Sequence, residues 1–222
     1  MTSDNIVFRV ATWLIPLVIA IVFHEVAHGW TALAFGDPTA KRKRRLSLNP
    51  IRHVDPIGTV VLPLALAVSG APVFGWAKPV PVVARRLRNP RVHMMLVALA
   101  GPGMNLLLAL VGALAWAGLT WLQPPATLGW EFLVLNVLNF ILINVSLAIF
   151  NLLPIPPFDG GHVVQGLLPR PLALRYARLA RFGFPILVVL LVLLPMANIH
   201  LVADLIGPPI RFLLRLLGLP VD

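Results

Sequence analysis

The chain of 222 residues contains no cysteine. This absence excludes disulfide bonds, thiolate-bound zinc and catalysis by a thiol nucleophile. Charged side chains are also scarce, because they make up 12% of the chain whereas typical soluble domains contain roughly 25%. Hydrophobic residues, by contrast, make up 59% of the chain. We therefore interpret the chain as an α-helical polytopic membrane protein.

Negative charge is scarcer than positive charge: 8 Asp and Glu stand against 18 Lys and Arg, for a net charge of +10. The basic residues occur in short clusters between apolar runs, a pattern typical of the positive-inside rule and of contact with anionic lipid head groups. No recognised nucleic-acid-binding motif is present, so we expect the lipid bilayer and not nucleic acid as a partner. Residues 1–5 lack the basic start of a signal peptide, and the following apolar run is too long for one. We expect no cleavage there.

Four apolar runs are long enough to cross the hydrocarbon core as helices, which takes about 20 residues. We expect four transmembrane helices over residues 6–35, 92–122, 130–153 and 182–206. Five consecutive basic residues at 41–45 place that end of the first helix in the cytoplasm, so the N-terminus is expected outside the cell (inner) membrane. Residues 210–219, with Arg211 and Arg215 on one face, are typical of an amphipathic interfacial helix.

A fifth apolar run, at 57–68, is only about 12 residues long and is interrupted by a proline, whereas a span requires roughly 17. Basic clusters lie on both sides of it, at 41–45 and 85–91. Since both clusters are expected in the cytoplasm, we favour a re-entrant or partial segment over a full span. Residues 76–82, with prolines at 79 and 81, are predicted to form an edge strand or β-hairpin.

The first apolar run contains His24-Glu25-Val26-Ala27-His28. Residues four apart lie on one face of a helix, so both imidazoles can bind a single Zn²⁺. Glu25, on the adjoining face, is placed to accept a proton from the attacking water. Ionisable groups within a membrane segment indicate a functional site. The motif therefore predicts a hydrolytic zinc site inside the bilayer, toward its cytoplasmic side.

A catalytic zinc needs a third protein ligand beside the two histidines. Of the two glutamates, Glu25 is already assigned, and Glu131 is expected at the outer end of its helix, far from the histidines. Asp159 follows the helix predicted at 130–153 on its cytoplasmic side, at about the depth of His28. This agreement in depth holds only if residues 57–68 do not cross the membrane. We predict Asp159 as the third ligand.

The sequences HEVAH at 24–28 and NLLP at 151–154, followed by DG at 159–160, resemble the paired motifs of the site-2 protease family. Residues 75–81 and 101–105 also resemble stretches of that family. Members of the family are intramembrane zinc metalloproteases. The resemblance covers the chain from about residue 20 to 165, with the motifs in the family's order.

The resemblance implies a ligand set and a catalytic set. His24, His28 and Asp159 would bind one zinc ion, and Glu25 would be the catalytic base. Asn151 would lie near the scissile carbonyl. The substrates would be transmembrane proteins or peptides, cleaved in or near their membrane-spanning segments in regulated intramembrane proteolysis.

The resemblance also implies an organisation. We expect a single membrane-embedded protease domain over 1–222, in a compact prokaryotic form without a PDZ domain. Its catalytic core would cover about 6–165 and its C-terminal helices about 170–219. The hairpin predicted at 76–82 would pair with an unwound substrate strand by β-augmentation. A leucine usually precedes the aspartate in the family, and Phe158 stands there in this chain.

Simpler interpretations of single residues stay open. Asp159 also fits a helix cap after a proline-rich turn. Asn151 also fits a hydrogen bond to carbonyls freed near Pro154. Other asparagines of the apolar runs fit hydrogen bonds between helices; they are Asn105, Asn136, Asn139 and Asn144.

Other functions stay open as well. A non-catalytic membrane metal-binding or scaffold protein derived from such a protease would keep the metal ligands, but it would not need Glu25. A transporter could use His200 and Asp204 as a proton relay, although no inverted repeat is visible. A zinc protease with a glutamate as third ligand would have to use Glu131. The sequence specifies neither the substrate nor the oligomeric state.

Overall fold

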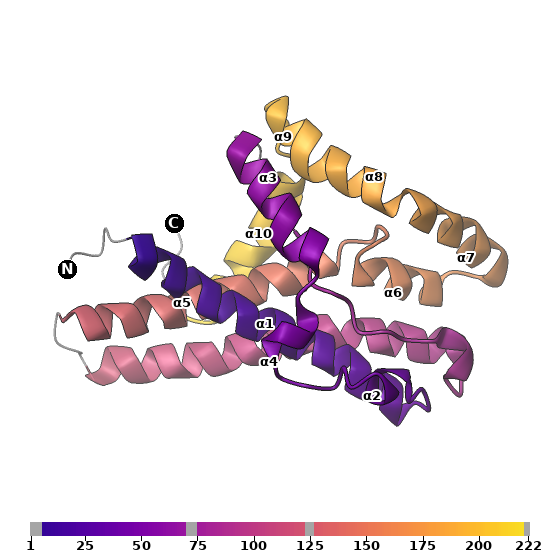
Figure 1. Ribbon diagram of the computed structural model, residues 1–222, viewed down its shortest axis with the longest axis horizontal. Helices are drawn as coiled ribbons and strands as arrows, with labels where there is room; N and C mark the ends of the chain where they lie inside the picture. Colours follow the sequence, from indigo (N-terminus) through magenta and orange to yellow (C-terminus); the bar gives the residue numbers. More distant parts are fainter. Residues whose placement is uncertain (1–5, 70–74, 123–126, 220–222) are drawn as a thin grey trace.

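The computed structural model describes residues 6–69, 75–122 and 127–219. Three long helices form its centre: α1 (Ile6–Ala34), α4 (Pro90–Leu122) and α5 (Leu128–Asn151). Each of the three packs against the other two (Figure 1). All three are long and apolar enough to cross a membrane. The α-helical polytopic architecture predicted from the sequence is confirmed.

Buried residues hold α4 and α5 together. Ile141 and Val145 of α5 are fully buried, and Ala109 of α4 belongs to the same cluster. Gly112 of α4 allows a close approach, because a Cβ atom there would lie 2.8 Å from Cγ1 of Ile141. Small residues serve this purpose in membrane helices, where backbones must come close for packing to stabilise the pair.

A fourth apolar helical segment extends from Arg170 to Met196. It consists of α7 (Arg170–Ala177), a 3-10 turn (Arg178–Phe182), α8 (Gly183–Val188), a π-helical turn (Val189–Leu193) and α9 (Leu194–Met196). A fourth segment long and apolar enough to cross a membrane is therefore present, and its helical bounds differ from the predicted 182–206 at both ends. The segment ends early because Asn198 has a left-handed φ of 58°, as asparagine does at helix ends. It begins early because the arginines from position 170 onward are helical.

The last helix, α10 (Leu201–Leu216), starts before the amphipathic helix predicted at 210–219. It contains Pro208 and Pro209, which lie between the span predicted to end at 206 and the helix predicted from 210. Leu214 of α10 is buried and packs into the cluster formed by α4 and α5. The apolar side of α10 thus contacts α5 directly.

The fifth apolar run forms a π-helical turn (Pro56–Val61) followed by α3 (Leu62–Ser69). Asp55 caps this helical segment, since its carboxylate accepts hydrogen bonds from the N–H groups of Ile57 and Gly58. The segment is about 21 Å long at 1.5 Å per residue, whereas the hydrocarbon core is about 30 Å thick. It is too short for a full span, and its re-entrant placement stays a prediction.

Residues 75–83 are extended but form no strand within the described chain, so the edge strand or β-hairpin predicted at 76–82 is wrong. The reason is that the backbone N–H groups of this segment are missing or already bound elsewhere. Pro79 and Pro81 have no N–H for a ladder. The N–H of Lys78 donates to the carbonyl of His53 at 2.9 Å, and the N–H of Val80 donates to a side chain of α1. Loop and helix groups therefore take up the donors that a partner strand would need.

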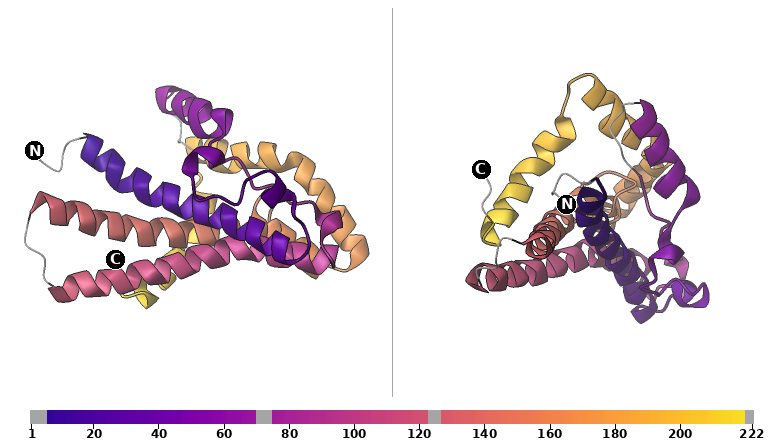
Figure 2. Two further views of the ribbon diagram at one scale, coloured as in Figure 1. Left: turned by 60° about the horizontal axis from the view of Figure 1, so that its bottom comes forward. Right: turned by 60° about the vertical axis from the view of Figure 1, so that its left-hand side comes forward.

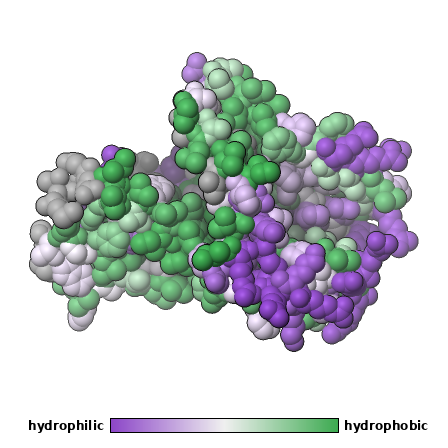
Figure 3. Space-filling model, in the orientation of Figure 1, coloured by the Kyte–Doolittle hydropathy of each residue, from purple (hydrophilic) through white to green (hydrophobic). Residues whose placement is uncertain are grey.

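Figure 2 shows α3 and the segment from α7 to α9 on the same side of the three central helices. Trp76 contacts Phe184 of α8 edge to face, with ring centroids 5.9 Å apart. Figure 3 shows hydrophilic residues gathered at the end that carries α2 (Thr39–Arg42) and the start of α4. The opposite end of the molecule and α3 present apolar residues. Such polarity fits a chain with its basic loops on one side of a bilayer.

Candidate metal centre

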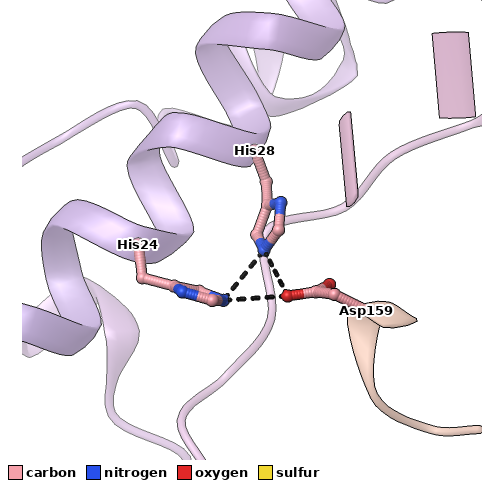
Figure 4. Close-up of side chains that lie close together, drawn as sticks. All are labelled: His24, His28 and Asp159. Atoms are coloured by element: carbon pink, nitrogen blue, oxygen red, sulfur yellow. Dashed lines mark hydrogen bonds and ion pairs between the residues drawn. The ribbon is translucent and has the colours of Figure 1, made fainter. Parts of the chain in front are cut away.

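Two histidines and one aspartate converge between α1 and α6 (Asp159–Leu167) (Figure 4). His24 and His28 are buried one turn apart on α1, and their Nε2 atoms lie 3.0 Å from each other. Oδ2 of Asp159 lies 3.2 Å from Nε2 of His24 and 3.3 Å from Nε2 of His28. The structure thus brings together the three side chains that the sequence predicts as metal ligands.

The ring of His28 is oriented by α4. Its Nδ1 lies 2.7 Å from the carbonyl oxygen of Val97. A carbonyl only accepts hydrogen bonds, so Nδ1 carries the proton and donates it. In the neutral ring, the lone pair is then on Nε2, which points at Asp159.

The ring of His24 is oriented by an asparagine pair. The amide nitrogen of Asn105 donates to Asn144 at 2.8 Å and to the carbonyl of Ala20 at 3.3 Å. Its oxygen therefore faces Nδ1 of His24, at 2.6 Å. An amide oxygen accepts, so Nδ1 of His24 is also the protonated nitrogen. The lone pair of this ring is again on Nε2.

Three lone pairs therefore meet with no proton between them when both rings are neutral. Oδ2 of Asp159 is buried and has no hydrogen-bond donor among the described residues. Convergent buried acceptors need a cation, and two imidazole nitrogens with one carboxylate oxygen are ligands that Zn²⁺ takes in catalytic sites. Ligand atoms at zinc distances in a tetrahedral arrangement lie about 3.3 Å apart. The residues present fit a zinc ion.

Gly101 of α4 leaves room for both rings. A Cβ atom at this position would lie 2.4 Å from Nε2 of His28 and 2.6 Å from Cε1 of His24. No side chain larger than hydrogen can stand there without moving the imidazoles. The glycine therefore sets how closely α4 approaches the centre.

Asp159 is presented by a proline-rich turn after α5. Phe158, next to it, is buried and contacts Phe150 of α5 edge to face, with ring centroids 4.5 Å apart. Gly160 is pressed against the backbone, because a Cβ there would lie 2.3 Å from the carbonyl oxygen of Leu152. Backbone packing thus holds the start of α6 close to the end of α5.

Glu25 lies beside the centre and is held by the extended segment 75–83. Its Oε2 accepts a hydrogen bond of 2.6 Å from the N–H of Val80. Prolines flank Val80 on both sides, so this N–H is the only backbone donor from 79 to 81. Val80 itself is buried, and its Cγ1 lies close to Gly29 of α1.

Asn151, predicted near the scissile carbonyl, is the last residue of α5. Its amide nitrogen donates to the carbonyl of Leu147 one turn earlier, at 2.9 Å. Within the described residues, no hydrogen bond joins it to the three convergent side chains. The simpler interpretation, a bond to a helix carbonyl, describes its observed contact, and its catalytic role stays a prediction.

The other candidate ligands lie elsewhere. Glu131 is in the first turn of α5, about 30 Å along the helix from Asn151 at 1.5 Å per residue. His200 precedes α10 and Asp204 is in its first turn. The group formed by His24, His28 and Asp159 is the one such cluster of three in the described ranges.

Asn105 and Asn144 were predicted only as links between helices. They do link α4 and α5, but the pair ends on His24 and fixes its tautomer. A histidine ligand normally donates its second N–H to a protein acceptor. That rule, applied to polar residues within the apolar runs, is the signal that could have found Asn105.

Comparison with known proteins agrees with this geometry. The model of "Peptidase family M50" matches residues 123–194. A protein of Bacillus subtilis (strain 168) named "Putative zinc metalloprotease YwhC" is 38% identical over 184 residues, which cover 81% of this chain and 79% of the relative. The chain belongs to peptidase family M50. This is the site-2 protease family that its motifs resemble, so the predicted metalloprotease class is confirmed.

Mycobacterial members of the M50 family are longer than the matched region. "Putative zinc metalloprotease Rip2" of Mycolicibacterium smegmatis is 32% identical over 187 residues, covering 82% of this chain and 66% of the relative. The Rip2 protein of Mycobacterium tuberculosis (strain ATCC 25618 / H37Rv) is 32% identical over 167 residues, covering 69% and 54%. No solved structure matches this M50 chain at a significant level.

Proposed function

We propose that this M50 peptidase cleaves peptide bonds in or near the transmembrane segments of other membrane proteins. The observation that carries the proposal is the convergence of three lone pairs from His24, His28 and Asp159 beside the apolar helix α1. Family membership and the names of the relatives support zinc as the ion that these residues hold. The site would thus bring hydrolysis into the region where a membrane-spanning substrate lies.

Zinc, when bound, lowers the pKa of water and polarises a carbonyl oxygen. The side chains of the chain do the rest. Glu25 accepts a proton from the attacking water and returns it to the leaving amine nitrogen. The N–H of Val80 fixes one carboxylate oxygen of Glu25, so the other oxygen is available for the proton.

The imidazoles are kept in the productive tautomer by their Nδ1 partners. Val97 accepts from His28 and Asn105 accepts from His24. Fixed rings hold their Nε2 lone pairs toward one point, which reduces the reorganisation needed when substrate binds. Gly101 keeps this space open.

We extend the proposal to Asn151 as a donor to the developing oxyanion. An amide nitrogen has two hydrogens, and the bond to Leu147 uses one of them. The second hydrogen can stabilise negative charge on the attacked carbonyl. A substrate helix must unwind to expose that carbonyl, since its backbone hydrogen bonds otherwise shield it.

The proposed setting is the cell (inner) membrane, with the N-terminus outside and the site toward the cytoplasm. In support, the basic run at 41–45 lies within and directly after α2, at the hydrophilic end of the molecule. Positive loops favour the cytoplasmic side. Cleavage of membrane proteins from this side is the chemistry of regulated intramembrane proteolysis, which we propose as the biological process.

A non-catalytic metal-binding or scaffold role is the alternative. Metal binding alone needs the three ligands and not a neighbouring carboxylate. Glu25 stands next to His24 with one oxygen fixed by the backbone. A carboxylate beside the ligands is what hydrolysis requires and what metal binding alone does not, so Glu25 favours the catalytic proposal.

The test compares purified wild type with Glu25→Gln in detergent. Zinc content is measured for both proteins, and cleavage of membrane-spanning peptides is followed by mass spectrometry. We expect stoichiometric zinc in both and a loss of cleavage of about 10²–10⁴-fold in the variant. Wild-type cleavage by a zinc-loaded Glu25→Gln protein would contradict the mechanism.

A further inference from the structure

The metal centre has a histidine half on α1 and an aspartate half on α6. Both halves contact α4. On the histidine side, Val97 and Asn105 of α4 bind the rings of His28 and His24. On the aspartate side, α6 packs along α4. The relative position of the ligands therefore depends on how α6 is attached to α4.

Arg91, in the first turn of α4, binds the C-terminal end of α6. Its Nε donates to the carbonyl of Gly166 at 2.9 Å, and its Nη2 donates to the carbonyl of Leu168. The last carbonyls of a helix have no intrahelical donors and carry partial negative charge. One guanidinium satisfies one carbonyl of the last turn, that of Gly166, and that of Leu168 directly after the helix, with a fixed geometry that a single amine cannot reproduce.

A close contact between the backbone of Gly166 and the side chain of Met95 lies beside this arginine. A Cβ atom at Gly166 would lie 2.8 Å from Cβ of Met95, one turn after Arg91 on α4. The C-terminal end of α6 therefore rests on the side chain of Met95, and Gly166 itself adds no side chain to the contact. The hydrogen bonds of Arg91 and the packing of Gly166 on Met95 therefore both hold the C-terminal end of α6 on α4.

Asp159 is the first residue of α6 and Gly166 lies near its end. The helix is about 13 Å long, so a shift or tilt at one end is transmitted to the other. Oδ2 of Asp159 has no hydrogen-bond donor among the described residues that could hold it independently. Its place relative to the histidines is set by the helix that carries it.

We propose that Arg91 is a positioning residue for the metal centre: it fixes α6 on α4 and thereby sets Asp159 against His24 and His28. The inference rests on the proposed zinc site and adds a determinant of its affinity. Arg91 touches neither metal nor substrate in this role. It acts through the backbone of α6.

The experiment measures zinc affinity of the full-length protein in detergent by competition with a chelator. Arg91→Gln removes the two hydrogen bonds, and Gly166→Ala forces α6 away from Met95 by a different route. The matched controls are Arg88→Gln, which loses a bond to Ala34 outside α6, and Gly103→Ala, whose new Cβ meets no described atom within 4 Å. Thermal unfolding with and without Zn²⁺ is recorded for every protein.

We expect both test variants to bind zinc about tenfold more weakly, a typical cost for a residue that supports a ligand. Arg91→Lys, with one charged donor group, should fall between wild type and Arg91→Gln. The zinc-induced rise in Tm should shrink in parallel, while the controls match wild type. Wild-type zinc affinity in both test variants would overturn the inference, as would a lower Tm of the metal-free protein with unchanged affinity. Failure of the wild type itself to bind zinc would instead overturn the proposed function.

Discussion

The histidine half and the aspartate half of the metal centre are built in different ways. His24 and His28 lie on one long helix, and each has a buried hydrogen-bond partner on α4. Asp159 opens a short helix after a proline-rich turn, and backbone contacts determine where it lies. Side-chain hydrogen bonds therefore orient one half, and docking of a whole element orients the other.

This difference predicts how each half responds to change. Loss of a buried partner leaves a polar atom unpaired and costs roughly 1–3 kcal/mol. The histidine half is therefore sensitive to the replacement of polar side chains on α4 that bind the rings. The aspartate half is sensitive to added volume wherever α6 or its turn touches backbone.

The largest expected effect comes from removal of a ligand in either half. Asp159→Ala and His28→Ala should each lose stoichiometric zinc and all measurable cleavage, because three protein ligands are required. Metal analysis and peptide cleavage provide the measurement. Glu131→Ala is the control and should keep both properties. Stoichiometric zinc in Asp159→Ala would remove the aspartate half from the site.

Added volume should come next, with an alanine placed in each half. A Cβ at Gly101 would lie 2.4 Å from Nε2 of His28, and a Cβ at Gly160 would lie 2.3 Å from the carbonyl oxygen of Leu152. Both contacts are too close to persist, so Gly101→Ala and Gly160→Ala should lose most of their zinc affinity. The chelator competition assay gives the comparison.

Gly118→Ala is the control for this pair, because its Cβ meets no described atom within 4 Å. It should bind zinc like wild type. Unchanged affinity in Gly160→Ala would show that the aspartate half tolerates displacement. The aspartate half would then not be the half that is sensitive to added volume.

A smaller effect is expected from the asparagine pair. Asn105→Ala removes the acceptor of His24 Nδ1 and should weaken zinc binding about 10- to 100-fold, as for other partners of histidine ligands. Asn144 contacts Asn105 and not His24, so Asn144→Ala should weaken zinc binding less. Isothermal titration of the metal-free proteins measures both values. Equal losses in the two variants would mean that the pair acts as packing and not as an ordered chain.

The smallest effect concerns Asp37, a fully buried carboxylate that contrasts with Asp159. Burial alone would raise the pKa of Asp37, but donors outweigh it: the Thr39 hydroxyl, the N–H groups of Val83 and Thr39, and the charge of Arg86. The net pKa is lowered. The stabilisation is therefore full at neutral pH and is lost as the pH falls below about 4.

Asp37→Asn tests this sign. Its Tm should be below that of wild type at pH 7, and the gap should narrow as the pH falls toward 3. Thermal unfolding in detergent at several pH values follows the gap. A gap that widens at low pH would contradict the assignment. Zinc affinity at pH 7 should stay near wild type, because Asp37 is outside both halves.

The sequence predicted that His24, His28 and Asp159 lie together, because the histidine motif is local and the relative depth of Asp159 could be estimated from the charge pattern. His24 and His28 are one helical turn apart, and the basic clusters predicted a similar depth for Asp159. The apolar runs gave three of the four spans closely for the same reason. Length and hydropathy determine a membrane helix with little help from tertiary contacts.

Two of the errors arose where long-range contacts decide, and one arose at a local backbone conformation. The hairpin failed because the N–H of Val80 is bound by Glu25 from α1, a pairing that local pattern does not contain. The end of the fourth span depends on the conformation of Asn198. The role of Asn105 required knowledge of which side of α4 faces His24. For the hairpin and for Asn105 the missing information is a contact between distant segments, whereas for Asn198 it is a local backbone conformation.

The bond between Glu25 and Val80 gives one carboxylate two duties. It belongs to the proposed base, and it also fastens the extended segment to α1. If this segment lifts away from α1, Glu25 must lose its backbone donor. The position of the segment and the hydrogen-bonding state of the base are therefore a single variable. A ligand that shifts the segment 75–83 therefore also changes the hydrogen bonding of Glu25.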